Sequence, residues 1–203
     1  MGTGNRFSRT VWPADFYSNG ETMTGVEFFS GDISIEPVGI VKNDLPDPPL
    51  VAREDGLHLN SACGPAVERM GETANRISEI ILAGTLVELL EGIDGYSHIV
   101  VLYWGHAVPS HGRSLKKTHP AGLVKYPKQG IYATCSPARP NPILMKVVRL
   151  IRRDGNRLFV EGLDAIDKSP VLDIKPYVAE MYPQEGVRIP GWMAEIQKEF
   201  ASR

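Results

Sequence analysis

The chain has 203 residues, of which 42% are hydrophobic and 23% are charged, as is typical of one globular domain with a sizeable core. The formal net charge of −2 and the pI of about 6.2 exclude the strong overall basicity of many nucleic-acid-binding proteins. A local basic patch remains compatible with RNA binding, because attraction depends on local charge density.

The cysteines and histidines show no metal-ligand spacing. Cys63 and Cys135 lie far apart, and His106, His111 and His119 fit no compact ligand pattern, so we expect no metal. Two cysteines without a secretory leader indicate reduced thiols in the cytoplasm. No run reaches the roughly 18 apolar residues of a membrane helix, so we expect no membrane contact.

The first half of the chain predicts one strand and then a mixed region. Residues 1–31 combine small polar residues with isolated aromatics and predict a partly ordered N-terminal extension. Ile33–Lys42 alternates and is rich in β-branched residues, which predicts a first strand. Ala66–Ile77 is compatible with a short helix. Ile80–Leu90 predicts a strand that ends in a helical turn, and its last leucines should share a packed face with Ile93.

The second half predicts the centre of a sheet and a final helix. Ser97–His106 is a continuous apolar run and predicts a buried strand, whereas Ala107–Gln129 predicts a long polar loop. Ile143–Arg152 and Arg157–Leu163 predict a hairpin around Asp154–Gly155. A short helix is expected over Gly191–Ala201.

These elements predict a mainly β (α+β) fold, a small β-barrel with peripheral helices and long loops. The predicted organisation is an N-terminal extension over 1–31, a barrel domain over 32–180 and a tail with a short helix over 181–203.

The most informative segment is Gly130–Leu150, with the sequence GIYATCSPARPNPILMKVVRL. Its three prolines fix φ, remove backbone donors and push each preceding residue toward extended geometry. A loop that only connects two strands rarely needs such restriction. The pattern therefore indicates that Ser136, Arg139 and Asn141 are held in one arrangement for a functional purpose.

This segment resembles the signature of the TrmO (TsaA-like) family, G-V-F-A-T-R-S-P-x-R-P-N-P-I-G. A second block, Gly162–Tyr177, is similar to the family's D-G-T-P-V-L-D-I-K-P-Y, and the resemblance runs from about Ile33 to about Tyr177. It implies a β-barrel unrelated to Rossmann-type methyltransferases, S-adenosylmethionine as cofactor, and a homodimer. The activity that it implies is N6-methylation of threonylcarbamoyl-adenosine at position 37 of tRNA.

The chain departs from the family pattern at several positions. Cys135 stands where the family has Arg, Gly105 replaces an aromatic residue, and Leu144–Lys146 replaces Gly-Leu-Ser. Because these departures concern the acceptor more than the cofactor, two alternatives stay open. One is a methyltransferase that acts on a small molecule, and the other is a non-catalytic S-adenosylmethionine-binding module.

The Pro-rich motif offers candidate cofactor ligands. Arg139 suits the cofactor carboxylate through its planar fork, or it holds a neighbouring loop by bonding carbonyls. Asn141 suits the adenine or the amino-acid end, or stabilises a turn. Ser136 contacts the ligand or bonds nearby backbone. Pro142 completes this group of candidates.

The second block adds further candidates. Asp173 points away from Leu172 and Ile174 if the strand is regular, so its carboxylate suits the cofactor ammonium or ribose. The alternative is an ion pair with Lys175. Leu172 and Asp173 join the predicted cofactor-binding residues, whereas Asp164 and Asp167 are interpreted as turn residues.

The candidate catalytic residues are His106 and Asp173. An imidazole near neutral pKa can take a proton from an acceptor N–H, although His106 also suits a hydrogen-bonded scaffold. The reaction is expected to be direct in-line methyl transfer, which depends on orientation and exclusion of water. The candidate substrate-binding residues, chosen for positive charge or for proximity to the motif, are Lys116, Lys117, Cys135 and Lys175. Trp104 and Tyr103 are the expected apolar anchors of the homodimer.

Overall fold

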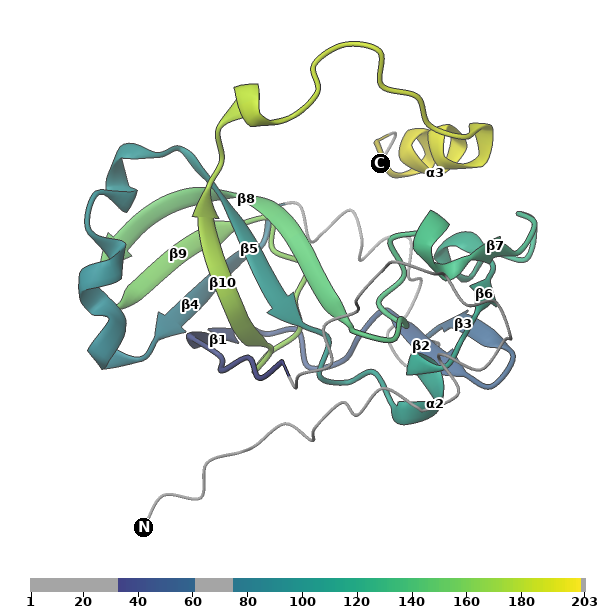
Figure 1. Cartoon of the computed structure of the whole chain (residues 1–203), viewed down its shortest axis with the longest axis horizontal. Helices are drawn as coiled ribbons and strands as arrows, with labels where there is room; N and C mark the ends of the chain where they lie inside the picture. Colours follow the sequence, from purple (N-terminus) through teal and green to yellow (C-terminus); the bar gives the residue numbers. More distant parts are fainter. Residues whose placement is uncertain (1–32, 61–74, 202–203) are drawn as a thin grey trace, which may run out of the picture. The chain divides into compact units, whose positions relative to one another are not determined.

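The computed structural model describes residues 33–60 and 75–201, shown as a ribbon in Figure 1. Residues 1–36 and 37–203 form separate units, and the elements below all belong to the second unit. The predicted extension over 1–31 and Cys63 lie outside the described residues. So does most of the helix predicted over 66–77, and Ile77 opens a strand instead.

Six strands form a closed antiparallel barrel in the order β1-β10-β5-β8-β9-β4 (Figure 1). The strands are β1 (Gly39–Lys42), β4 (Ile77–Leu82), β5 (His98–Trp104), β8 (Ile143–Asp154), β9 (Arg157–Glu161) and β10 (Pro170–Pro176). The predicted mainly β fold with a small barrel is confirmed. The first predicted strand is shorter than expected, because only its last four residues pair with β4 and β10.

Alternation along the strands places apolar side chains inside the barrel. In β5, Ile99, Val101 and Tyr103 belong to the core, and in β8 the same face carries Val148 and Leu150. Each fully buried side chain of this size contributes about 1.5–3 kcal/mol to folding. The predicted hairpin is confirmed: β8 and β9 pair around a turn in which Gly155 has a φ of 58°.

A 3-10 helix follows β4, as the sequence predicted. η4 (Gly84–Leu90) is joined by η5 (Ile93–Gly95), and two further 3-10 turns, η7 (Ile131–Ala133) and η8 (Ala179–Met181), lie later in the chain. Leu90 is buried, but Leu89 is 75% exposed. The prediction that Leu89 and Leu90 pack on one face was therefore wrong. Adjacent side chains of a 3-10 helix, which has three residues per turn, point about 120° apart.

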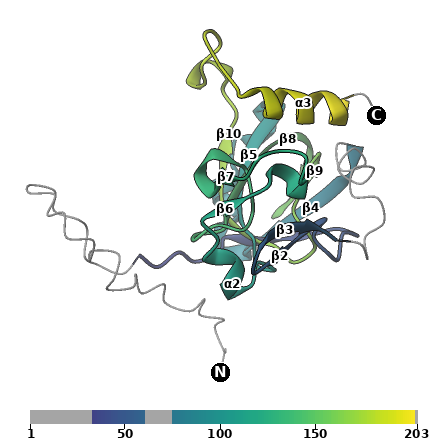
Figure 2. The same cartoon turned by 90° about the vertical axis from the view of Figure 1, so that its right-hand side faces the viewer.

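Two small sheets and two helical turns form a small lobe, which we define as residues 50–59 and 107–130. It lies to the right of the barrel in Figure 1 and in front of it in Figure 2. Its elements are β2 (Leu50–Arg53), β3 (Gly56–Leu59), α2 (Ser110–Arg113), β6 (Lys117–Thr118), η6 (Pro120–Gly122) and β7 (Gln129–Gly130). The long polar loop predicted over residues 107–129 is therefore interrupted by short helical turns and strands.

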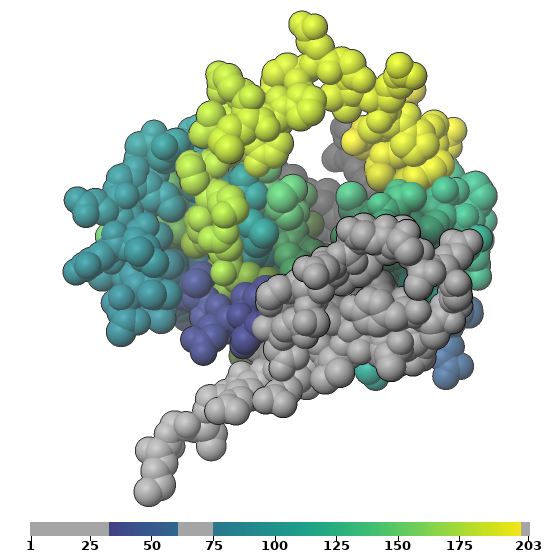
Figure 3. Space-filling model, in the orientation of Figure 1, coloured from purple at the N-terminus to yellow at the C-terminus, as the bar shows by residue number. Residues whose placement is uncertain are grey.

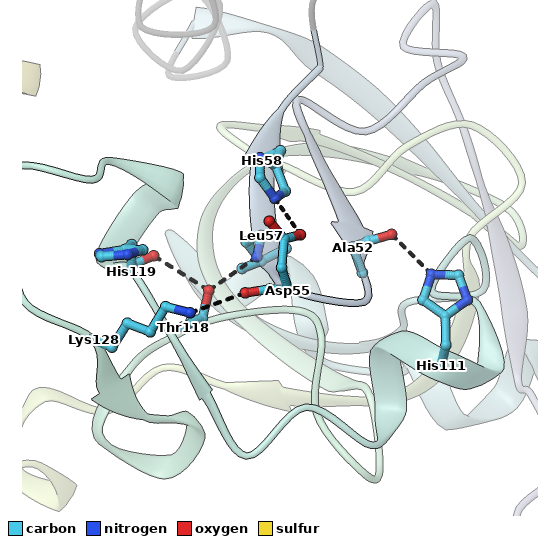
Figure 4. Close-up of polar contacts among 8 residues, drawn as sticks. All are labelled: Ala52, Asp55, Leu57, His58, His111, Thr118, His119 and Lys128. Atoms are coloured by element: carbon cyan, nitrogen blue, oxygen red, sulfur yellow. Dashed lines mark hydrogen bonds and ion pairs between the residues drawn. The ribbon is translucent and has the colours of Figure 1, made fainter.

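Polar contacts, rather than a large hydrophobic core, join residues 50–59 of the small lobe to residues 107–130 (Figure 4). The buried Thr118 hydroxyl accepts the backbone N–H of Leu57 at 3.0 Å, and His111 Nε2 donates to the carbonyl of Ala52 at 3.0 Å. Gly112 allows this approach, since a Cβ there would lie 2.6 Å from the Cβ of Ala52. Segments about 60 residues apart in sequence are thus fastened together.

The C-terminal helix α3 (Gly191–Ala201) has the predicted bounds and packs on the small lobe. Ile196 is buried, and the Glu199 carboxylate accepts hydrogen bonds from Lys125 and from the Tyr126 hydroxyl. Figure 3 shows the segment between β10 and α3 as an arch over an opening. None of the helices that the structure describes has the length and apolarity to cross a membrane.

Candidate functional site

A cleft of about 1030 Å³ lies between the barrel and the small lobe. One wall consists of β2 and the segment before it, and the other consists of β8 with residues 105–109 and 132–139. The volume is at the upper end of the range of about 300–1,000 Å³ found for small-molecule sites. The space is sufficient for a nucleoside-sized cofactor together with part of an acceptor.

The Pro-rich loop is closed by its own hydrogen bonds. The Ser136 hydroxyl accepts the backbone N–H of Ala138 at 3.1 Å, and Ser136 N–H donates to the Thr134 hydroxyl at 3.2 Å. Arg139 donates from Nε to the Ser136 carbonyl at 2.9 Å and from Nη2 to the Thr134 carbonyl at 2.8 Å. The loop is therefore pre-organised, and Arg139 lines the cleft from this fixed position.

The end of the same loop is fastened to the end of β5. The Pro142 carbonyl accepts the N–H of Gly105 at 2.8 Å, and Pro142 is buried. Asn141 accepts the N–H of Ile143 through its carbonyl at 2.7 Å. Ser136, Asn141 and Pro142 lie outside the cleft lining. In this chain they support the loop, and any contact between them and a cofactor stays a prediction.

His106 is brought to the cleft by this connection. Its Nδ1 atom is buried and has no hydrogen-bond partner among the described residues. Burial lowers the pKa of His106, and the charge of Asp167 opposes this shift only in part. The neutral imidazole is therefore the dominant form near pH 7, which is the form that a proton acceptor requires.

The candidates on β10 do not join this group. The register between β10 and β5 shifts between Val171 and Asp173, so the strand is not regular at Leu172 as the sequence argument assumed. Asp173 Oδ2 lies 2.5 Å from Lys175 Nζ, and its Oδ1 accepts the N–H of Ile174 at 2.9 Å. The Asp173 carboxylate raises the pKa of Lys175. Leu172, Asp173 and Lys175 lie outside the cleft lining.

The predicted substrate-binding residues divide into two groups. Cys135 carries an exposed free thiol and lines the cleft directly before Ser136. Lys116 and Lys117 are exposed on the small lobe, away from the lining. Over residues 33–60 and 75–201, no cluster of His, Cys, Asp and Glu has the size needed to hold a metal ion.

A further polar group in the cleft escaped the sequence interpretation. The Tyr103 hydroxyl donates to Asp164 Oδ1 at 2.7 Å, and Lys146 Nζ lies 3.7 Å from Asp164 Oδ2. All three residues line the cleft. Burial, and then the charge of Asp164, raises the pKa of Tyr103, so the phenol keeps its proton and donates it. The expectation that Asp164 is only a turn residue was incomplete.

One signal for this group was present in the sequence. Tyr103 shares the inward face of β5 with Ile99 and Val101, and a phenol among buried apolar residues requires a hydrogen-bond partner. The partner comes from a distant segment that sequence spacing does not place. The same core position makes Tyr103 wrong as an anchor of a dimer, since only 5% of its surface is exposed.

Comparison with known proteins identifies the family. The family model of the tRNA-methyltransferase O N-terminal domain matches residues 66–182. A protein of Archaeoglobus fulgidus, named S-adenosyl-L-methionine-binding protein, is 33% identical over 147 residues, which are 72% of this chain and 91% of that protein. A mouse tRNA (adenine(37)-N6)-methyltransferase is 28% identical over 74% of this chain and 32% of its own length.

The fold comparison agrees. The crystal structure of TrmO from Pseudomonas aeruginosa superimposes with a TM-score of 0.57 and 27% sequence identity, and the match covers 82% of this chain. The chain spans 64% of the length of that structure. The resemblance inferred from the two sequence motifs is confirmed. The chain belongs to the family of the tRNA-methyltransferase O N-terminal domain.

Proposed function

We propose that the protein is an S-adenosylmethionine-dependent methyltransferase that methylates N6 of a modified adenosine, threonylcarbamoyl-adenosine 37, in tRNA. The observation that carries the proposal is the family match over residues 66–182, which includes the barrel wall of the cleft and the whole Pro-rich loop. The name of the mouse relative supports the tRNA acceptor, and that of the archaeal relative supports the cofactor.

The cleft residues fit S-adenosylmethionine. The cofactor has a carboxylate, an ammonium group and an adenine, and when bound it supplies an electrophilic methyl group on a sulfonium centre. The Arg139 guanidinium suits the carboxylate, since only two of its five N–H donors are used in the loop. Asp47 of the lining suits the ammonium group, and Leu50, Leu57 and Ile143 offer apolar surface to the adenine.

The chain's own residues would act mainly by orientation. The closed hydrogen bonds of residues 134–139 remove freedom before a ligand arrives, which lowers the entropy cost of aligning two reactants. The buried Nδ1 of His106, which has no partner among residues 33–60 and 75–201, is an available acceptor or donor in this wall. Apolar side chains on both walls exclude water from the reacting groups.

A basic surface on the small lobe supports RNA as the acceptor. Lys116 and Lys117 are exposed, and neither ammonium group has a hydrogen bond or ion pair within the described part of the chain. By contrast, Lys125 is engaged by Glu199, and Lys128 donates to the Asp55 carbonyl at 3.2 Å. The two unpaired ammonium groups are available to phosphates, and such binding would weaken with salt. A tRNA acceptor implies a cytoplasmic location.

The homodimer is also a proposal. Met145 is 60% exposed, Val147 is 36% exposed and Tyr132 is 80% exposed, so apolar surface remains uncovered along the barrel wall of the cleft. A second copy that covers this surface would also narrow the cleft. Light scattering at micromolar concentration should give twice the monomer mass of 22.3 kDa.

Two measurements test the function. Calorimetry should detect S-adenosylmethionine binding, and mass spectrometry of tRNA nucleosides after incubation should detect an added methyl group on threonylcarbamoyl-adenosine. Absence of that product, with the cofactor bound, would contradict the tRNA assignment.

The other readings have specific support. Lys146 places a cation inside the cleft where the family motif has a serine, which favours a distinct acceptor such as an anionic small molecule. The archaeal relative is named only for binding, which favours a non-catalytic module. Methyl transfer to a component of a low-molecular-weight extract would support the small-molecule methyltransferase. Cofactor binding without transfer to any acceptor would support the non-catalytic module.

A further inference from the structure

Asp164 differs from the other acids near the cleft in how it is held. The Tyr103 hydroxyl, which belongs to the barrel core, donates to Oδ1 at 2.7 Å. The Asp164 side chain is nevertheless 46% exposed and lines the cleft. One oxygen is thus anchored from inside the barrel, and the direction of the second oxygen is fixed by the planar carboxylate.

The second oxygen has no protein hydrogen bond within the described residues. Lys146 Nζ lies 3.7 Å from Oδ2, which is beyond hydrogen-bond distance. The Lys146 ammonium group therefore places positive charge beside the carboxylate but leaves Oδ2 free to accept a hydrogen bond from a ligand. An N–H donor of a bound molecule is the natural partner of such an oxygen, since a carboxylate accepts charge-assisted hydrogen bonds.

Three other carboxylates in or near the cleft are engaged elsewhere, whereas the exposed Asp47 has no partner that orients it among the described residues. Both Asp173 oxygens have partners in Lys175 and the N–H of Ile174. Asp167 Oδ1 accepts the N–H of Asn43 at 3.1 Å, and Asp167 does not line the cleft. Glu161 lines the cleft but lies 3.4 Å from Arg149 Nη1 in an ion pair.

We propose that Asp164 is a catalytic residue, whose Oδ2 binds the acceptor N–H and receives its proton during methyl transfer. Tyr103 and Lys146 are positioning residues that fix the carboxylate. The inference rests on the proposed function. In the step, the acceptor nitrogen bonds to the methyl carbon while the carbon–sulfur bond breaks and its electron pair stays on sulfur. The nitrogen proton moves to Oδ2 and later leaves to water.

The test compares Asp164→Asn with Asp154→Asn, which neutralises an exposed aspartate that also lies beside a cation, Arg152, but outside the cleft lining. Asp164→Asn keeps an oxygen acceptor for Tyr103 and should leave the unfolding midpoint and S-adenosylmethionine affinity unchanged. The rate with saturating tRNA should fall about 100-fold, within the usual contribution of a general base. Asp154→Asn should retain the rate of the unaltered protein.

A second readout does not require turnover. Calorimetry would measure binding of the nucleoside N6-threonylcarbamoyl-adenosine to protein saturated with S-adenosylhomocysteine. Asp164→Asn should weaken this binding about tenfold, as expected for loss of a charge-assisted hydrogen bond, whereas Asp154→Asn should not.

The outcomes separate the two proposals. Equal rates and equal nucleoside affinity in the two variants would overturn the role of Asp164 and leave the tRNA methyltransferase standing. A loss of cofactor affinity in Asp164→Asn would also overturn it, because the carboxylate would then serve the cofactor. If the unaltered protein methylates a small molecule instead of tRNA, the proposed function fails, and the rate of Asp164→Asn on that molecule decides the inference. If the unaltered protein neither transfers a methyl group nor binds the nucleoside, the proposed function and the role of Asp164 are both overturned.

Discussion

Arg139 combines two tasks that the sequence presented as alternatives. Its Nε and Nη2 groups hold the carbonyls of Ser136 and Thr134, yet the residue also lines the cleft. A guanidinium has five N–H donors in a rigid fork, so the loop contacts leave donors for a ligand. Holding the loop is therefore part of presenting a ligand-binding group in a fixed direction.

Arg139→Ala should weaken S-adenosylmethionine binding by about 10- to 100-fold and lower the free energy of unfolding by about 1–3 kcal/mol. The first effect follows from loss of a carboxylate partner, and the second from two carbonyls that lose their donors. Calorimetry and denaturant unfolding measure the two effects separately. Arg188→Ala, in an exposed segment, is the control. Unchanged cofactor affinity in a folded Arg139→Ala variant would contradict the ligand role.

His106 makes stability depend on pH in a direction that its burial determines. Burial lowers the pKa of His106 below its ordinary value of 6.5, and Asp167 opposes this shift. The unfolded chain therefore binds the proton more readily than the folded chain. The stabilising contribution is complete above about pH 6.5 and declines as the pH falls below it.

His106→Gln should therefore reduce the loss of stability between pH 7.5 and pH 5.5, because the variant has no imidazole to protonate. Denaturant unfolding at the two pH values provides the measurement. His98→Gln, which changes an exposed histidine at the start of β5, is the matched control. A slope that His106→Gln leaves unchanged would assign the pH dependence to another group.

At the scale of elements, sequence patterns predicted what depends on local alternation. β5, the β8–β9 hairpin and α3 follow from apolar runs, a turn dipeptide and helical periodicity. The bulge at Leu172 was not predictable, because it depends on how β10 pairs with β5. The predicted direction of the Asp173 side chain assumed a regular strand, and it failed because of this bulge.

The small lobe was missed because its strands are short and its core is minimal. β6 and β7 have two residues each, too few for a periodic signal. The elements are held by contacts such as Thr118 to Leu57, which join residues 61 positions apart. For the site, the Pro-rich motif made Arg139 a candidate and the end of a buried strand made His106 one, and both line the cleft. The Tyr103–Asp164 contact was not predictable, because it forms only when the barrel closes.

Close packing of α2 against β2 gives an element-scale prediction. Gly112→Ala should lower the free energy of unfolding by about 1–3 kcal/mol, since the new Cβ would overlap the Cβ of Ala52. Ala52→Gly in the same chain should recover part of the loss, as a double-mutant cycle by denaturant unfolding would show. Gly130→Ala is the matched control, because its Cβ would meet no atom within 4 Å. Equal effects of the two alanine substitutions would contradict this packing argument.

At the scale of the whole molecule, charge is distributed unevenly even though the net charge is only −2. The small lobe holds several cations, which differ in whether their charged groups contact other side chains or backbone. Lys125 and Lys128 are engaged by Glu199 and by the Asp55 carbonyl, and Arg113 lies 5.4 Å from the ring centroid of Trp104. Lys116 and Lys117 are left exposed, so a small part of the surface can carry the electrostatic attraction to RNA.

The double variant Lys116→Ala/Lys117→Ala should weaken tRNA binding and flatten its salt dependence. Two phosphate contacts fewer reduce the slope of log K against log salt by about 1.4–1.8, the range between single-stranded and duplex nucleic acid. S-adenosylmethionine affinity should stay unchanged, because neither lysine lines the cleft. Filter binding across a salt series measures the slope, and calorimetry measures the cofactor.

Lys125→Ala/Lys128→Ala is the matched control for that experiment, since it removes the same charge from lysines that already have protein partners. Its salt slope should stay closer to that of the unaltered protein. If both double variants lose tRNA equally, the lobe acts through its total charge rather than through two exposed lysines. If neither variant changes the slope, the RNA-binding surface lies on another face. If the unaltered protein does not bind tRNA at low salt, a small-molecule acceptor becomes the better account of the cleft.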